Sequence, residues 1–257
     1  RIEINGELPA NVMSKDVILR IIGDLTAAGA TYRALEFTGD TVEAMSLSSR
    51  MTMANMGIEA GAKCALFAPD EKTAEYLGIE LTDAERALAG DADAPCEKVL
   101  RYRAEDFVPV MALPSNVDHV AAIRDLEPVA IDQVFLGSCT NGRLEDLMAA
   151  AEILKGKHIA PFVKLIVTPA SRKIWEEAEA NGTLAILSAA GAMITHPSCG
   201  LCCGRTGGIL SDGERVVATN NRNFLGRMGS SKVEIYLASP KSAAASALTG
   251  RLTEAPC

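Results

Sequence analysis

The sequence lacks any long hydrophobic run. Apolar stretches such as Ala192 to Ile194 fall far short of the roughly 20 residues that a membrane-spanning helix needs. A run of basic residues is also missing, and the 257 residues carry a formal net charge of −8. Surfaces that bind nucleic acid or anionic membranes usually show such a basic patch. We therefore expect no membrane partner and no general nucleic-acid partner.

A disulfide framework is also missing. The seven cysteines are odd in number and unevenly spaced, in a chain whose residues are 48% hydrophobic. This usage favours reduced thiols that serve a metal or catalysis, and it predicts a cytosolic protein. The sequence begins at Arg1 rather than at Met and shows no signal-peptide pattern, so we expect a fragment or a processed chain.

What the sequence does contain is an alternation of strand and helix signals. In the first half, helical periodicity covers residues 17–25, after Ser14 or Asp16 as a cap, and again residues 41–56, while strands are predicted at 32–38 and 64–67. The acidic, alanine-rich segment 82–95 indicates a surface excursion, and residues 99–116 an extended bridge. In the second half the predicted strands are 134–136, 164–167, 192–195, 215–219 and 233–237, and the predicted helices are 144–154, 171–181 and a last helix between Pro240 and Gly250.

This alternation predicts an α/β protein built from two layered α/β/α units with mostly parallel sheets. We assign residues 1–13 to a strand ribbon or the end of a preceding domain. Residues 14–116 form the first α/β unit with its bridge, and residues 117–257 form the second unit.

Three glycine-containing loops follow predicted strands of the second unit, at residues 138–142, 196–204 and 220–227. Ligands of open α/β sheets gather beyond the carboxyl ends of parallel strands, so parallel strands would bring all three loops to one edge. The thiols of Cys139, Cys199 and Cys202 would then meet there. Their spacing alone favours an iron–sulfur cluster and a zinc site about equally, with His196 as a fourth zinc ligand and a redox pair as a weaker alternative.

Four motifs extend this pattern, and they are Asn55-Met56-Gly57-Ile58-Glu59-Ala60-Gly61-Ala62, Gly137-Ser138-Cys139-Thr140-Asn141-Gly142, Cys199-Gly200-Leu201-Cys202 followed by Gly204, and Asn221-Arg222-Asn223-Phe224-Leu225-Gly226-Arg227. In the residues of these motifs and in their order, the chain resembles the aconitase superfamily, and within it the large subunits of the isopropylmalate and homoaconitate dehydratases. The resemblance implies the fold of the aconitase iron–sulfur domains. It also implies a [4Fe-4S] cluster held by Cys139, Cys199 and Cys202, with the fourth iron open to water or substrate.

The resemblance also assigns the neighbours of the cluster. Asn55 and Asn221 correspond to amides beside the cluster, and Glu59 corresponds to a carboxylate near the hydroxyl that leaves. Arg222 and Arg227 correspond to arginines that bind substrate carboxylates, for which a guanidinium fork is well suited. Cys203 is expected to be a packing residue, because the two-residue gap of the family selects Cys202.

The implied activity is that of a hydro-lyase which dehydrates and rehydrates a 2-hydroxy di- or tricarboxylate, such as the isopropylmalate isomerisation of leucine biosynthesis in the cytoplasm. The amino-terminal domain of the family is missing from the sequence, and the mobile swivel domain would be a separate small subunit. These partners would complete the active site. The alternative is a non-catalytic domain in which the thiols bind zinc or a cluster for structure or sensing.

Overall fold

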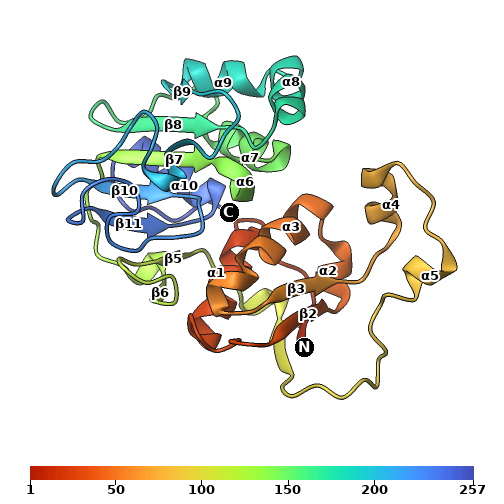
Figure 1. Ribbon diagram of the computed structural model, residues 1–257. Coiled ribbons are helices and arrows are strands. Elements are labelled where there is room, and N and C mark those ends of the chain that lie inside the picture. Colours follow the sequence, from red (N-terminus) through yellow and green to blue (C-terminus); the bar gives the residue numbers. More distant parts are fainter.

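The computed structural model describes residues 1–257 as two sheets with helices around them (Figure 1). The first half contains β1 (Ile2–Asn5), α1 (Ser14–Leu25), β2 (Ala34–Thr38), α2 (Asp40–Ala44), α3 (Leu47–Met56), the 3₁₀ helix η1 (Gly57–Ala60), β3 (Cys64–Phe67), α4 (Glu71–Leu77), α5 (Asp83–Arg86) and β4 (Leu100–Arg103). The second half contains β5 (Val110–Ala112), β6 (Val120–Ala122), β7 (Gln133–Gly137), α6 (Ser138–Asn141), α7 (Leu144–Leu154), β8 (Lys164–Thr168), α8 (Arg172–Ala180), α9 (Thr183–Ala189), β9 (Met193–Ile194), the 3₁₀ helix η4 (Gly200–Cys203), β10 (Arg215–Ala218), β11 (Glu234–Leu237) and α10 (Pro240–Thr249). Every helix is too short or too polar to cross a membrane.

Both sheets are mostly parallel, which confirms the predicted α/β class. The first sheet has the strand order β3-β2-β1-β4, and all of its pairs are parallel. The second has the order β6-β5-β11-β10-β7-β8-β9, in which the five strands from β11 to β9 are parallel. β5 and β6 extend its edge in the antiparallel sense. The carboxyl ends of β10, β7, β8 and β9 therefore lie side by side.

Two apolar cores hold the sheets in place. One core belongs to the second unit alone, where α7, α9 and α10 cover one face of the large sheet. The other core joins the two units, because side chains of α1 and β1 pack together with those of β10 and β11. Helix α1 also contacts β5 and so lies between the two sheets (Figure 1). The first unit thus serves as part of the cover of the second sheet.

The structure differs from the sequence prediction in the first unit. The helix predicted at 41–56 is two helices, because Met45 is extended with ψ 145° and the hydroxyl of Ser46 accepts the amide of Ser49 to start α3. Strand β1 pairs with both β2 and β4, so it lies inside the first sheet although residues 1–13 had been set apart.

The segment between the sheets is also more specific than an extended bridge. β4 belongs to the first sheet and β5 to the second, so the chain passes from one sheet to the other between Arg103 and Val110. In the second unit, helix α9 was missed, because Gly182 both follows α8 and begins α9 with a left-handed φ of 81°.

Candidate functional site

The three loops lie together at the carboxyl edge of the second sheet. Loop 138–142 follows β7, loop 196–204 follows β9, and loop 220–227 follows β10, which is paired with β7. The side chains of Asn55 on α3 and Glu59 on η1 reach the same edge from the first unit. The structure therefore brings all eight predicted site residues into one region, namely Asn55, Glu59, Cys139, Cys199, Cys202, Asn221, Arg222 and Arg227.

The turn that presents Cys139 has an unusual backbone. Gly137 has φ 134°, and an added Cβ would lie 2.0 Å from the carbonyl oxygen of Thr168. Ser138 follows with φ 66°, which is uncommon for a residue with a side chain, and its buried hydroxyl has no hydrogen-bond partner. Strained backbone is found at functional sites more often than elsewhere. Here it turns the exposed thiol of Cys139 out of β7.

The Cys199–Cys203 loop lies tightly against the ends of the neighbouring strands. Gly200 has φ 53°, and an added Cβ would lie 2.6 Å from the hydroxyl oxygen of Thr168 and 3.1 Å from the ring of Phe135. Cys199 is exposed and Cys202 is half-buried. Glycine at this position lets η4 approach the sheet that also carries Cys139.

The thiols are close enough to influence one another. Burial and the neighbouring thiols of Cys139, Cys202 and Cys203 raise the pKa of Cys199, and Arg227 opposes that shift. No group of three or more His, Cys, Asp or Glu side chains is arranged to hold a metal ion. Thiolates of a cubane cluster bind separate irons, so they need not converge on one ion. Three cysteine thiols are donors of the chemical kind that iron–sulfur clusters use.

His196, the possible fourth zinc ligand, has a different partner. Its ring stacks on the indole of Trp175 at 5.3 Å between centroids and 20° between planes. A tetrahedral zinc site would need four ligands directed at one point. The position of His196 gives no support to that arrangement.

A ring of hydrogen bonds connects Cys139 with three polar side chains. The amide of Asn55 donates to Cys139 Sγ at 3.8 Å, and its oxygen accepts from the amide of Asn221. Asn221 in turn accepts from the hydroxyl of Thr140, which lies 3.9 Å from Cys139 Sγ. Asn55 thus contacts the thiol of Cys139 directly, and Asn221 contacts Asn55.

The arginines have different partners. Arg222 Nε donates to Glu59 Oε1 at 2.8 Å, which links two residues that are 163 positions apart. Arg227 Nε donates to the carbonyl oxygen of Cys202 at 2.6 Å, and its Nη2 lies 3.5 Å from Cys202 Sγ. The guanidinium of Arg227 also lies over the ring of Phe224, 5.4 Å from the centroid. Arg222 therefore holds the carboxylate of Glu59, and Arg227 holds the cysteine loop.

Sequence reasoning missed three buried ionisable residues behind this region. Burial lowers the pKa of Lys15 to about 7, although the Asp146 carboxylate opposes the shift. Burial raises the pKa values of Asp16 and Asp146 to about 7 in each case. From the sequence, Asp16 is a candidate cap of the helix over 17–25 and Asp146 lies in the first turn of the helix over 144–154, and neither position predicts burial.

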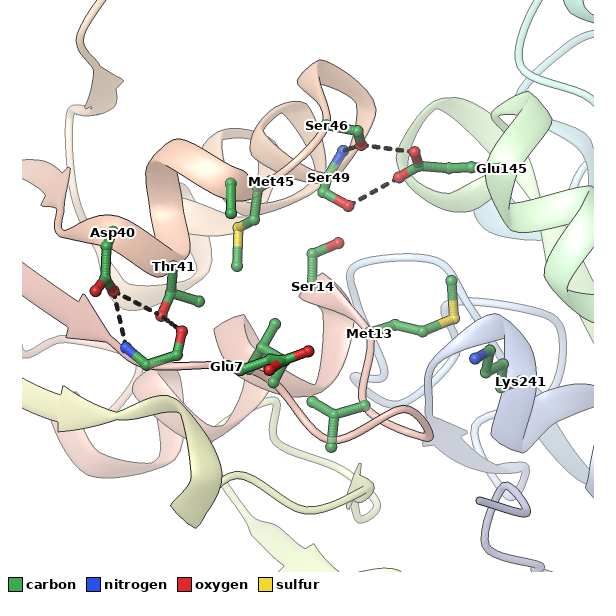
Figure 2. Close-up of a pocket in the computed structure, with 14 residues that line it drawn as sticks. Glu7, Met13, Ser14, Asp40, Thr41, Met45, Ser46, Ser49, Glu145 and Lys241 are labelled. Atoms are coloured by element: carbon green, nitrogen blue, oxygen red, sulfur yellow. Dashed lines mark hydrogen bonds between the residues drawn. The ribbon is translucent and has the colours of Figure 1, made fainter.

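A cavity of about 760 Å³ lies where the two units meet, and the cysteine loops do not line it. At one side of it Ser46 and Ser49 donate to Glu145 at 2.6 and 2.8 Å (Figure 2). Lys241 and Glu7 line the same cavity. Cys139 and Cys199 are exposed, so groups from elsewhere can approach their thiols.

Comparison with known proteins agrees with the motifs found in the sequence. The profile of the Aconitase family (aconitate hydratase) matches residues 1–250. The chain is 49% identical over 254 residues to 3-isopropylmalate dehydratase large subunit 1 of Methanopyrus kandleri, covering 99% of this chain and 61% of the relative. The corresponding values are 46%, 99% and 61% for large subunit 2 of Archaeoglobus fulgidus, and 48%, 96% and 59% for the large subunit of Halothermothrix orenii.

The chain thus spans about three fifths of the length of these curated relatives. The match to the family profile nevertheless covers nearly all of its residues, including the three loops and the segment that carries Asn55 and Glu59. The chain belongs to the aconitase family.

Proposed function

We propose that this chain is the iron–sulfur part of a hydro-lyase of the 3-isopropylmalate dehydratase type. The observation that carries the proposal is the group of thiols at the carboxyl edge of the second sheet, with Asn55 and Asn221 bonded beside Cys139. The relatives named as 3-isopropylmalate dehydratase large subunits support the same reaction class.

Cys139, Cys199 and Cys202 are the residues that would hold a [4Fe-4S] cluster. When bound, the cluster supplies an open iron that acts as a Lewis acid toward the hydroxyl of the substrate. Asn55 donates to the sulfur of Cys139 and stays oriented through Asn221. Hydrogen bonds of this kind to a ligand sulfur tune a cluster and fix its ligands.

The remaining site residues would handle the substrate. Elimination of water places negative charge on a substrate carboxylate, which a guanidinium fork can bind with two parallel hydrogen bonds. Arg222 and Arg227 of loop 220–227 would supply this fork. Glu59, held by Arg222 at 2.8 Å, is placed to exchange a proton with the departing hydroxyl.

The exposure of Cys139 and Cys199 fits a partner that closes the site. The name "large subunit" of the relatives supports a small-subunit partner, and the 2-hydroxy carboxylate would bind between the two. All seven cysteines are free thiols, which fits a cytoplasmic enzyme.

A direct test is to assay the full-length large subunit with its small subunit, comparing wild type with Arg227→Lys and with Arg205→Lys as the control. Arg205 is exposed and directly follows the loop 196–204. Lysine cannot reproduce a bidentate grip, so Arg227→Lys is expected to lower kcat/KM for 3-isopropylmalate by about tenfold or more. Arg205→Lys is expected to match wild type.

The visible spectrum of the reconstituted protein separates the roles. Under this proposal Arg227→Lys keeps the iron–sulfur absorption. If the absorption is lost instead, the bond of Arg227 to the Cys202 loop explains its effect, and the assignment of Arg227 to the substrate is wrong. A wild-type protein that takes up only zinc and has no dehydratase activity would favour the non-catalytic alternative.

A further inference from the structure

Lys15 is a fully buried lysine at the junction between the two units. It lies in the first turn of α1, with 0% of its surface exposed. Lysine is almost never fully buried unless its ammonium has partners. Here the partners are main-chain oxygens, because Nζ donates to the carbonyl of Thr219 at 2.9 Å and to the carbonyl of Asn220 at 2.7 Å.

Thr219 and Asn220 are the two residues that directly precede the pair Asn221-Arg222. The carbonyl of Asn220 and the amide of Asn221 share one planar peptide group, so a bond that fixes this carbonyl also fixes the start of Asn221. From there Asn221 bonds to Asn55 and Thr140, and Arg222 bonds to Glu59. Lys15 therefore binds the peptide group that joins Asn220 to the site residue Asn221.

The other hydrogen bonds of Thr219 and Asn220 do not come from the first unit. The amide of Asn220 is bonded within the loop, donating to the carbonyl of Arg222 at 3.0 Å, while its buried oxygen has no partner. Thr219 is held from β7, because its amide donates to the carbonyl of Phe135 at 3.0 Å and its hydroxyl accepts the amide of Gly137 at 2.9 Å. Lys15 is thus the group from the first unit that binds the main chain of the loop, at Thr219 and Asn220.

We propose that Lys15 is a positioning residue, which holds the Thr219–Asn220 main chain from the first unit and thereby sets Asn221 and Arg222 at the site. The catalytic consequence rests on the proposed function. The structural consequence does not, because it concerns only the order of the loop.

The test compares Lys15→Met with wild type by hydrogen–deuterium exchange and mass spectrometry on the full-length protein. Methionine keeps a long, apolar stem but donates no hydrogen bond, so two buried carbonyls lose their donor. Exchange in the segment 219–223 is expected to be about tenfold faster, or more, with strand β7 unchanged. Trypsin is expected to cleave after Arg222 correspondingly faster.

The matched control is Lys241→Met. Lys241 also donates to a main-chain carbonyl, that of Ala10 at 2.7 Å, but it lines the cavity away from the loop. Its replacement is expected to leave exchange in 219–223 at the wild-type rate. Lys15→Gln is a second variant in case the methionine variant does not fold. Its amide can still donate, so a smaller increase is expected in the same segment.

Two results would overturn the proposal. One is unchanged exchange in 219–223 in the Lys15 variants. The other is an increase spread evenly over the chain, since that would show a general loss of stability. In the enzyme with its small subunit, Lys15→Met is expected to raise KM by about tenfold and to be non-additive with Arg222→Lys. If wild type lacks dehydratase activity, the proposed function fails, while the exchange comparison still decides the role of Lys15.

Discussion

The two sheets of the molecule differ in how they are covered. Every residue of β7 is buried, and β8, β10 and β11 are exposed or half-buried only at their first residue. In the first sheet, β3 and β4 alternate between half-buried and exposed positions, so one face stays partly open to solvent. The central strands of the sheet that carries the cysteine loops are thus more deeply buried than the edge strands of the first sheet. The first sheet mainly supports it and contributes a few side chains to the site.

The largest effect on the free energy of unfolding is expected when a buried side chain of β7 is shortened. Phe135 is 0% exposed in the centre of β7, whereas Leu66 on β3 is 52% exposed. Phe135→Ala is expected to reduce the free energy of unfolding by about 3–5 kcal/mol, because it removes a buried ring and leaves a cavity. Leu66→Ala is expected to change it by about 0.5 kcal/mol or less. Urea unfolding followed by circular dichroism measures both, and equal effects would contradict the contrast.

Much of the second unit could be predicted from the sequence because its buried parallel strands are apolar runs that end in glycine-rich loops. That pattern identified the loops around Cys139, Cys199 and Arg222 as neighbours. The contact of Arg222 with Glu59 could not be predicted from spacing, since it joins residues far apart in the chain. The role of Lys15 was also hidden, because a lysine in the first turn of a helix usually faces water.

A smaller effect is expected in the cysteine loop itself. Gly200→Ala places a Cβ 2.6 Å from Thr168 in a left-handed backbone, whereas Gly213 has φ 82° with nothing within 4 Å of an added Cβ. Gly213→Ala should cost about 1 kcal/mol of stability from backbone strain alone. Gly200→Ala should cost about 1–2 kcal/mol more through the clash and weaken iron binding. Unfolding and iron titration of both variants isolate the clash, and identical behaviour would rule it out.

The pH dependence of stability gives a third comparison, at the polar junction between the units. Burial raises the pKa of Asp146 to about 7, so between about pH 4 and 7 the unfolded chain has lost a proton that the native state keeps. Stability therefore falls as the pH rises through this window, by at most about 1.4 kcal/mol per pH unit from this group. Asp146→Asn removes the titration, so its stability curve should be flatter.

Asp16 and Lys15 also contribute to the pH dependence of stability, but the curve of Asp146→Asn should still be flatter than that of wild type. Asp16 has the same direction of shift, so part of the slope should remain in the variant. Lys15, whose pKa is lowered to about 7, acts above that pH, where stability rises as the unfolded chain holds the extra proton. Denaturation midpoints of wild type and Asp146→Asn from pH 4 to 9 would show both trends. Parallel curves would contradict the assignment to Asp146.

The smallest effect is expected on the surface of the second unit. Arg172 and Glu176 form an i,i+4 pair at 2.8 Å with side chains 86% and 57% exposed. Exposed pairs of this kind contribute little, so Arg172→Ala should change the free energy of unfolding by about 0.5 kcal/mol or less. A larger loss in thermal unfolding would show that the outer helices matter more than the buried sheet suggests.

The central claim is that Cys139, Cys199 and Cys202 hold a [4Fe-4S] cluster at the carboxyl edge of the second sheet. It is tested most directly by iron and sulfide analysis after anaerobic reconstitution of wild type, Cys139→Ser and Cys203→Ser. We predict about four irons and four sulfides per chain for wild type and Cys203→Ser, and loss of the cluster for Cys139→Ser. A Cys139→Ser protein that retains the full cluster, or a Cys203→Ser protein that loses it, would contradict the account.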